Sequence, residues 1–310
     1  MSPPRPAEGA DGQALVAWAA QHLQDPQGRE LAAAVQWWEL PGLPDRWPVA
    51  VLGQGPPLLL LHGFDSSFLE FRRIAPLLSP HHRLLIPDLR GFGFSPRSAA
   101  SQASATVSGA DGGDHGPEAV LRHLEALLEA LAGDPDTAGP LGLIGASMGG
   151  SVAVCLARRQ PSRINRLLLL APAGLSGRPM PLPPLLDGLG VRFLSLPSVR
   201  RGLCRSAFAD PDADVGEPEL EIASLHLATP GWAAALARFA RSGGFAGVGQ
   251  PLPPQPLSVL WGADDRILRA PQKRAAQLLL GERISELERC GHLPHIDRPE
   301  AVAERWFAGP

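Results

Sequence analysis

The serine at position 147 has the surroundings of a nucleophile. Residues 145–149 read GASMG, which matches the pattern G-x-S-x-G between the apolar run LGLI and a sequence of helical character. Such a serine sits in strained backbone at a tight turn from a strand into a helix. The glycines at 145 and 149 avoid clashes with nearby backbone segments. The free N–H groups at the start of the helix favour developing negative charge. The pattern therefore predicts that Ser147 attacks a carbonyl carbon.

A serine hydroxyl needs a base, and two later segments supply a base and its partner. The segment ISELERCGH is predicted to form a strand that ends at His292, and LSVLWGADD a strand that ends at Asp264 and Asp265. Sites in open α/β sheets form at the carboxyl ends of strands. We expect His292 to be the general base and an aspartate to hold its imidazole ring. The spacing G-x-x-D from Gly262 favours Asp265, whereas Asp264 would fix the loop or face solvent.

The negative charge that forms on an attacked carbonyl oxygen needs two N–H donors. We expect one from Met148, which follows the nucleophile, and one from Phe64 in the loop HGFDSS after an earlier strand. We expect His62 to shape that loop rather than to take part in chemistry. Asp88 and Arg90, in PDLRGFGFS, are expected to fix a second loop at the same end of the sheet.

The pair His292 and His295 raises the question of a metal. A His-x-x-His pair can ligate a metal ion, but no cluster of further ligands is evident, and Pro294 between the two histidines argues against a shared helical face. We therefore expect no metal and no cofactor, and we expect His295 to pack or hydrogen-bond beneath the loop.

Apolar runs and helical patterns alternate along most of the chain. This alternation predicts an α/β fold with a mostly parallel, doubly wound sheet and an inserted helical cap. The predicted strands are 35–40, 47–53, 56–63, 82–88, 141–147, 164–172, 256–265 and 284–292. The predicted helices include segments within 13–34, 68–79, 117–132, 148–161, 271–280 and 299–307.

Two stretches interrupt the alternation. Residues 97–116 are small, polar and glycine-rich, which is typical of an exposed loop. Residues 174–249 contain no clear buried strand and are predicted to form the helical cap. The predicted organisation is therefore a mobile N-terminal segment and helix over 1–34, a core made of 35–173 and 250–310, and the cap between the two parts of the core.

The predicted cap supplies apolar side chains for a substrate. With Phe64, we expect these side chains to line an apolar binding cleft, although they could equally form the cap's own small core. The expected residues are Phe64, Leu189, Phe193, Trp232, Leu236 and Phe239.

Composition limits the partners and the compartment. The net charge of −3 and the lack of a dominant basic patch argue against nucleic acid. Three widely spaced cysteines do not suggest a disulfide framework, and we identify no secretory signal or membrane-spanning run. We expect a cytoplasmic protein, or one associated peripherally with a membrane through its apolar cap; the oligomeric state is left open.

From about residue 47 onward the sequence resembles the α/β-hydrolase superfamily. The segments LLHGFDSSFLEFRR, PDLRGFGFS, LHLATPGWAAALARFARSGGF and CGHLPHIDRPE are similar to those of chlorophyll dephytylases from photosynthetic organisms. That resemblance implies Ser147 as nucleophile, Asp265 as acid and His292 as base, with HGFDSS as the oxyanion loop. It also implies cleavage of the phytyl ester of chlorophyll, at a photosynthetic membrane. The absence of an evident transit peptide is typical of a bacterial homologue.

These observations define the functional hypotheses. A serine at the elbow favours acyl transfer, because enzymes of this fold that open epoxides or carbon–halogen bonds use an aspartate there. We therefore expect a carboxylic ester hydrolase for a large apolar substrate, with chlorophyll as the leading candidate. The alternatives are a general carboxylesterase or lipid esterase, a C–C bond hydrolase, and a non-catalytic ligand-binding protein on a hydrolase scaffold.

Overall fold

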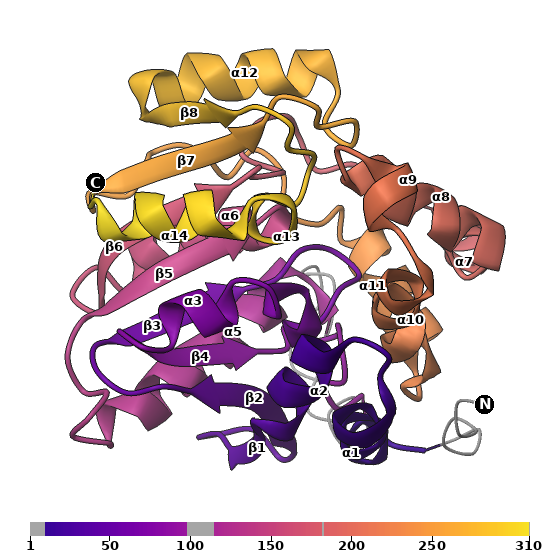
Figure 1. Ribbon diagram of the computed structural model, residues 1–310, viewed down its shortest axis with the longest axis horizontal. Helices are drawn as coiled ribbons and strands as arrows, with labels where there is room; N and C mark the ends of the chain where they lie inside the picture. Colours follow the sequence, from indigo (N-terminus) through magenta and orange to yellow (C-terminus); the bar gives the residue numbers. More distant parts are fainter. Residues whose placement is uncertain (1–9, 98–114, 182, 310) are drawn as a thin grey trace.

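The computed structural model describes residues 10–97, 115–181 and 183–309. Most of the segment predicted as a polar loop, residues 98–114, and the first nine residues lie outside these ranges. Within them, the chain forms one eight-stranded sheet with helices on both faces (Figure 1). The predicted α/β fold with a mostly parallel, doubly wound sheet is confirmed.

The sheet has the order β1-β2-β4-β3-β5-β6-β7-β8. The first two strands form an antiparallel edge, and all pairs from β4 to β8 are parallel. The central strands β3 and β5 are buried along their whole length, which explains their sequences PLLLL and LGLIGA, in which every residue is uncharged and non-polar. The strands are β1 (Val35–Glu39), β2 (Arg46–Leu52), β3 (Pro57–Leu61), β4 (Arg83–Pro87), β5 (Leu141–Ala146), β6 (Ile164–Leu170), β7 (Leu257–Gly262) and β8 (Ile284–Leu287).

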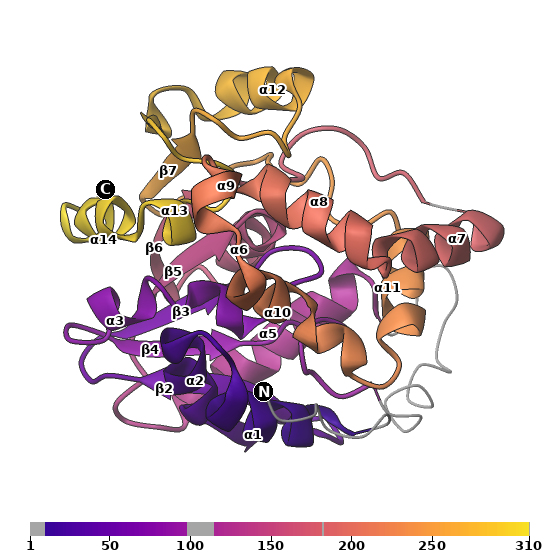
Figure 2. The ribbon, with the colours of Figure 1, turned by 45° about the vertical axis from the view of Figure 1, so that its right-hand side comes forward.

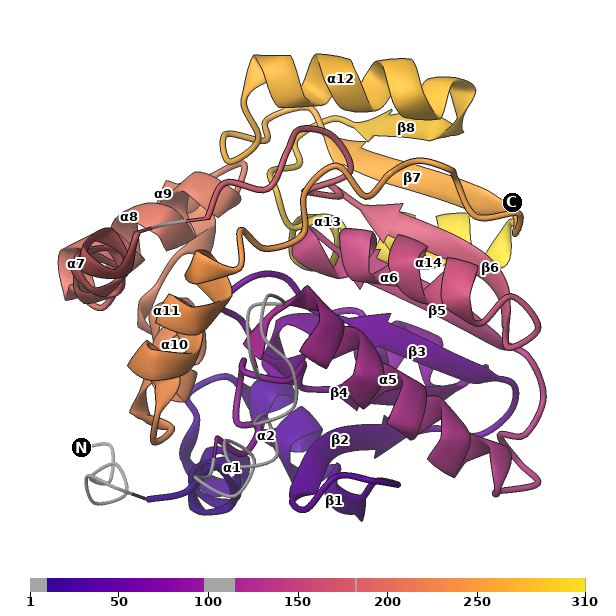
Figure 3. The ribbon, with the colours of Figure 1, turned by 180° about the vertical axis from the view of Figure 1, so that it is seen from behind.

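Helices cover the two faces of the sheet, and each face has its own apolar core. Figure 3 shows α5 (Pro117–Ala132) and α6 (Met148–Arg159) on one face. Figure 1 shows α3 (Ala75–Leu78) and α14 (Pro299–Phe307) on the other. The remaining elements near the sheet are α1 (Gly12–His22), α2 (Pro26–Ala33), the 3-10 turns η1 (Phe68–Phe71) and η4 (Gly281–Arg283), α12 (Ala270–Leu280) and α13 (Pro294–Asp297).

Between β6 and β7 the chain leaves the sheet and forms a group of helices. Figures 1 and 2 show them together at one end of the sheet. The segment predicted as a cap, residues 174–249, contains these helices. They are α7 (Pro184–Leu194), α8 (Pro197–Ala207), α9 (Pro211–Asp214), α10 (Glu217–Leu225), η3 (His226–Ala228) and α11 (Trp232–Arg241).

Three elements differ from their predicted extents for local reasons. The N-terminal helix is divided in two, because Asp25 caps a new helix by accepting the Gly28 N–H and Pro26 occupies its first position. The predicted helix over 68–79 is also divided, into η1 and α3, because Pro76 has no N–H to continue the hydrogen-bonding pattern. The strand β8 stops at Leu287, because Arg289 adopts a left-handed backbone with φ of 52°.

Two glycines allow the close approaches on which the site depends. A Cβ atom on Gly149 would lie 2.7 Å from the carbonyl oxygen of His62 and closer still to that of Leu61. A Cβ atom on Gly262 would overlap the backbone of Cys290 and Gly291. Glycine at these positions therefore lets the first turn of α6 lie against the end of β3, and the end of β7 lie against the loop before His292.

Candidate active site

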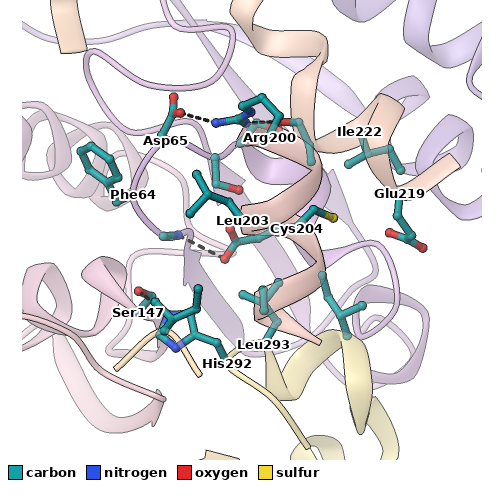
Figure 4. Close-up of a pocket in the computed structure, with 18 of the residues that line it drawn as sticks. Phe64, Asp65, Ser147, Arg200, Leu203, Cys204, Glu219, Ile222, His292 and Leu293 are labelled. Carbon is teal, nitrogen blue, oxygen red and sulfur yellow. Dashed lines mark hydrogen bonds and ion pairs between the residues drawn. The ribbon is translucent and has the colours of Figure 1, made fainter. Parts of the chain in front are cut away.

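Ser147 lies at the turn from β5 into α6 in a strained backbone, with φ of 51° and ψ of −117°. Backbone hydrogen bonds to nearby segments of the same chain hold this conformation. The Ser147 N–H donates to the Leu170 carbonyl oxygen at 2.8 Å, and its own carbonyl oxygen accepts the Ala173 N–H at 3.0 Å. The end of β6 thus fixes the turn, and the serine side chain points into the cavity shown in Figure 4.

The structure brings Ser147, His292 and Asp265 into one hydrogen-bonded chain. The Ser147 Oγ lies 2.8 Å from His292 Nε2, and the His292 Nδ1 lies 3.0 Å from Asp265 Oδ2. With the proton on Nδ1, the imidazole donates to the carboxylate, and its free Nε2 accepts the serine proton. Asp265 lies in the loop after β7, and His292 lies in the loop after β8. These three residues have the geometry that activates a serine hydroxyl.

Asp265 is held as an ionised acceptor on both oxygens. Oδ2 also accepts the indole N–H of Trp261 at 2.9 Å, and Oδ1 accepts the N–H groups of Ile267 and Leu268 at 2.8 and 3.1 Å. Burial by itself raises the pKa of Asp265, but the hydrogen bond and charge of His292 and the two backbone donors hold that pKa below its usual value. Asp264 is exposed, so of the two aspartates Asp265 contacts the histidine.

The two residues expected to donate to an oxyanion flank the serine. Met148 is the first residue of α6, so its N–H has no partner four residues earlier within the helix. Phe64 follows Gly63, and a Cβ atom built on Gly63 would lie 3.3 Å from the Cβ atom of Ser147. The loop that contains Phe64 therefore runs directly beside the nucleophile.

A buried carboxylate supports this loop from behind. Glu70 Oε1 accepts the N–H of Gly63 at 3.1 Å and lies 3.3 Å from Nε2 of His295. Burial raises the pKa of Glu70, but its contacts with His295, the charge of His62 and a hydrogen bond from Ser66 together hold that pKa below its usual value. His295 is fully buried against the ring of Phe71, so it lies beneath the loop, away from Ser147.

Replacing Glu70 by glutamine should weaken the support of the loop without removing it. The amide oxygen can still accept the Gly63 N–H, but the charge that faces His295 is lost. We expect kcat for an ester substrate to fall about tenfold with little change in KM, since the loop contains Phe64, the expected oxyanion donor. Steady-state kinetics would measure this, with Glu286→Gln on the exposed edge of β8 as control. Equal kinetics for the two variants would contradict this role of Glu70.

His62 and Asp88 are occupied by backbone groups. The Nδ1–H of His62 donates to the Gly63 carbonyl oxygen at 2.8 Å, and Nε2 accepts the Leu89 N–H at 2.9 Å. Asp88 accepts the N–H groups of Phe68 and Phe94 at 2.7 and 2.6 Å. Both side chains therefore fix loops at the carboxyl end of the sheet. Burial raises the pKa of Asp88 to about 7, despite these backbone hydrogen bonds.

Asp65 joins the loop after β3 to the helices between β6 and β7. Oδ1 accepts the indole N–H of Trp232 at 2.8 Å and lies 3.1 Å from Nε2 of His226. Oδ2 accepts a hydrogen bond from Nη1 of Arg200 at 2.5 Å (Figure 4). The Asp65 carboxylate is buried, and its backbone adopts a φ of 49° next to Phe64. One side chain thus connects α8, η3 and α11 to the loop that lies beside the nucleophile.

A cavity of about 270 Å³ opens above Ser147 and His292 (Figure 4). The helices α8 and α10 form one side of it, and the loops that contain Phe64 and His292 form the other. Its apolar lining includes Phe64, Leu194, Leu203, Ala207, Phe208, Ile222, Ile267, Leu293 and Ile296.

The end of the cavity farther from Ser147 contains charged side chains whose charges are paired with one another. Arg72 donates from Nε to Asp25 at 3.3 Å and also pairs with Glu219. Arg73 lies 2.5 Å from Asp25 and 3.0 Å from Glu219. Burial lowers the pKa of Arg72 to about 10, so it stays cationic at neutral pH. The cluster joins the N-terminus of α2 and the segment after η1 to α10, and both arginines in it are paired with carboxylates.

Of the six side chains expected to line a cleft, Phe64 lines this cavity and the other five lie elsewhere. Leu189 and Phe193 are exposed on α7, with 64% and 59% of their surface accessible. Trp232, Leu236 and Phe239 are buried on α11, where they join the core cluster that also contains Phe92 and Phe245. The reason is geometric: α11 packs its apolar face onto the core, and α8 and α10 form the wall of the cavity instead.

Sequence reasoning missed several residues that shape the site. Asp65, Glu70 and Trp261 were not singled out, although Asp65 and Glu70 lie within the quoted motif HGFDSSFLE. A buried acidic residue beside a predicted oxyanion loop was an available signal. The sequence of α8, PSVRRGLCRSA, contains no signal that this helix forms a wall of the cavity, because it has few large apolar residues and three arginines.

Two kinds of feature are absent from the described ranges: a metal-ligand cluster and a membrane-spanning helix. Residues 10–97, 115–181 and 183–309 contain no cluster of three or more histidine, cysteine or acidic side chains arranged to hold a metal ion. In the same part of the chain, no helix has the length and apolar content needed to cross a bilayer.

Residues 58–305 match the model of the alpha/beta hydrolase family, and the chain belongs to that family. It is 28% identical over 262 residues to 2-hydroxy-6-oxo-2,4-heptadienoate hydrolase of Pseudomonas putida, covering 80% of this chain and 86% of that one. It is 27% identical over 263 residues to alpha/beta hydrolase domain-containing protein VTE7 of Arabidopsis thaliana, covering 83% and 74%. Among solved structures, epoxide hydrolase CorEH superposes with a TM-score of 0.70 at 20% identity, covering 89% and 97%. The protein is therefore an α/β-hydrolase.

Proposed function

We propose that this α/β-hydrolase cleaves a carboxylic ester through an acyl-enzyme on Ser147. The observation that carries the proposal is the continuous hydrogen-bonded chain from Ser147 through His292 to Asp265 at the floor of a cavity. Ser147 Oγ attacks the ester carbonyl carbon while His292 Nε2 takes the hydroxyl proton, and Asp265 stabilises the imidazolium. The imidazolium then protonates the leaving alcohol. Water, deprotonated by His292, attacks the acyl-enzyme and releases the acid.

The oxyanion of each tetrahedral intermediate is stabilised by the N–H groups of Phe64 and Met148 in this proposal. Both lie beside Ser147, one in the loop after β3 and the other at the first position of α6. Donors fixed in place before the reaction favour the transition state because no reorganisation is needed when charge develops.

We further propose that the substrate is a large apolar ester, with the phytyl ester of chlorophyll as the leading candidate. The support is the apolar lining of the cavity and the sequence resemblance to chlorophyll dephytylases. The cavity volume of about 270 Å³ is below the range of about 300–1,000 Å³ that encloses drug-sized ligands. Only one arm of such an ester would be enclosed, with residues 174–249 as its cap, and the macrocycle would remain at the mouth.

The charges in the cavity favour an ester as substrate over a 2-hydroxy-6-oxo-2,4-heptadienoate, the compound named for the Pseudomonas putida relative. A heptadienoate has a carboxylate, and binding it in an apolar cavity calls for a cation that is free to pair. The two arginines among the described lining residues, Arg72 and Arg200, are already paired with carboxylates. A neutral ester fits this lining without an unpaired charge.

A substrate panel tests the proposal. We expect hydrolysis of long-chain p-nitrophenyl esters, and release of free phytol from chlorophyll and pheophytin, with kcat/KM at least tenfold above that for p-nitrophenyl acetate because each buried methylene adds about 0.8 kcal/mol. Phytol would be measured by gas chromatography. Preference for the acetate without pigment cleavage would contradict the apolar substrate, and C–C cleavage of the heptadienoate alone would contradict ester hydrolysis.

A further inference from the structure

Exposed apolar side chains gather on one segment of the described chain. Large apolar residues are usually buried, and a contiguous exposed group marks a binding surface. Most of the large apolar side chains that are exposed here lie between residues 180 and 203. They are Met180, Leu186, Leu189, Phe193, Leu196 and Leu203, and we call this group the apolar rim.

The helix α7 explains why the apolar rim needs a partner. Its sequence PLLDGLGVRFL has Asp187 and Arg192 as its charged residues, and a helix that is apolar nearly all round is normally buried. One side, including Val191, packs into the core with α11. The residues Leu186, Leu189 and Phe193 recur at spacings of three and four and form a stripe on the other side. Figures 2 and 3 show α7 at the outer edge of the molecule.

Positive charge accompanies the apolar rim. Residues 178–205 contain five arginines and one aspartate, in a chain whose net charge is −3. Arg178 and Arg192 are exposed, and in the described part of the chain no carboxylate pairs with either. Arg201 is also exposed, although Glu217 lies 3.1 Å from it. An apolar stripe flanked by these arginines matches the surface of an anionic lipid bilayer.

The apolar rim is continuous with the mouth of the cavity above Ser147. Leu203 belongs to both, and Leu194 on α7 also lines the cavity. Phe64, 44% exposed, lies at the same opening. An apolar molecule that leaves a bilayer at this surface would therefore meet apolar side chains all the way to the serine.

We propose that α7 and α8 lie on the surface of an anionic phospholipid bilayer, with the apolar rim inserted at the boundary of headgroups and acyl chains. A second copy of the chain fits less well, because pairing two such surfaces would bring the exposed Arg178 and Arg192 of both copies together. The use of the surface for substrate entry rests on the proposed function, but the binding itself requires no catalysis.

Vesicle co-sedimentation of the full-length protein tests the proposal. We expect the protein to sediment with vesicles of equimolar phosphatidylglycerol and phosphatidylcholine, and to sediment less with phosphatidylcholine alone. The double substitution Leu189→Ser and Phe193→Ser should weaken partitioning about a hundredfold, since two apolar side chains are lost from the interface. The double substitution Arg178→Gln and Arg192→Gln should weaken it about tenfold on anionic vesicles and little on neutral ones. Leu278→Ser, which changes a side chain 90% exposed on α12, is the matched control and should bind as the wild type does.

The outcomes separate this proposal from the catalytic one. Ser147→Ala should bind vesicles as the wild type does, because vesicle binding requires no catalysis. Vesicle binding can therefore be lost while hydrolysis persists, and hydrolysis can be lost while vesicle binding persists. Failure of the wild type to sediment with anionic vesicles would overturn the proposal, and so would equal sedimentation of the Leu189/Phe193 variant and the Leu278 control. A wild-type dimer by light scattering that becomes monomeric in the Leu189/Phe193 variant would assign the apolar rim to self-association and would also overturn it.

Discussion

Replacing Ser147 by alanine should lower kcat for ester hydrolysis by about four to six orders of magnitude. Losses of this size follow when the nucleophile of a Ser-His-Asp triad is removed. The side chain of Ser147 points into the cavity and reaches its neighbours through Oγ, so the fold should be retained. Hydrolysis of a long-chain p-nitrophenyl ester would measure the rate, and thermal unfolding would check folding. A fluorophosphonate probe should label the wild type at Ser147 and leave the variant unlabelled.

A matched control is available one turn further along the same helix. Ser151 is buried in α6, and its hydroxyl donates to the carbonyl oxygen of Ala173 rather than to a histidine. Ser151→Ala should therefore change kcat by less than about tenfold, because it removes a hydrogen bond and no nucleophile. Wild-type rates in Ser147→Ala, or probe labelling at another serine, would contradict the proposed mechanism.

Replacing Asp65 by alanine should have the largest effect on stability of the substitutions considered. The change leaves the buried Arg200, His226 and Trp232 without their common acceptor. We expect the free energy of unfolding to fall by about 3–5 kcal/mol, the usual consequence of removing one partner of a buried ion pair. Urea denaturation would measure it. Asp264→Ala, at an exposed aspartate, should change stability by less than about 0.5 kcal/mol.

The pH dependence provides a second test of Asp65. Burial raises the pKa of Asp65, but the hydrogen bond from His226, with Arg200 and Trp232, outweighs burial and holds that pKa below its usual value. A lowered carboxyl pKa stabilises the fold above the ordinary aspartate pKa of about 3.9, and this contribution is lost as pH falls through the folded-state pKa. The difference in unfolding free energy between the wild type and Asp65→Asn should therefore narrow in acid. A constant difference from neutral pH downward would contradict an ionised Asp65.

The fold was largely predictable, because each central strand has a distinctive pattern. Strands buried on both faces, such as β3 and β6, are continuous runs of leucine, and the helices between them have a clear helical period. Element ends were less predictable. The division between η1 and α3 depends on the single missing N–H of Pro76, and the end of β8 depends on the backbone of Arg289, neither of which changes the hydrophobic pattern.

The positions of Ser147, His292 and Asp265 were more predictable than the cavity above them. Ser147, His292 and Asp265 each follow a recognisable strand, so topology alone brings them to one edge of the sheet. The walls of the cavity depend instead on how the helices after β6 pack, and that packing involves contacts distant in sequence, such as the hydrogen bond from Trp232 to the carboxylate after β3. An apolar pattern does not reveal which face of a cap helix turns inward. Leu189 on α7 is exposed, for example, whereas Leu236 on α11 is buried.

The helical segment departs after β6 and returns at β7, and these two strands are adjacent in the sheet, with Leu170 paired to Leu260. Insertions, deletions or wholesale exchange between these points leave the hydrogen-bonding of the sheet intact. Specificity can therefore diverge during evolution while the reaction machinery stays constant. Two buried groups of the core limit such exchange. Asp65 has its three side-chain partners in the exchangeable part, and Arg72 pairs there with Glu219. Any replacement must therefore supply new partners to these side chains or change them.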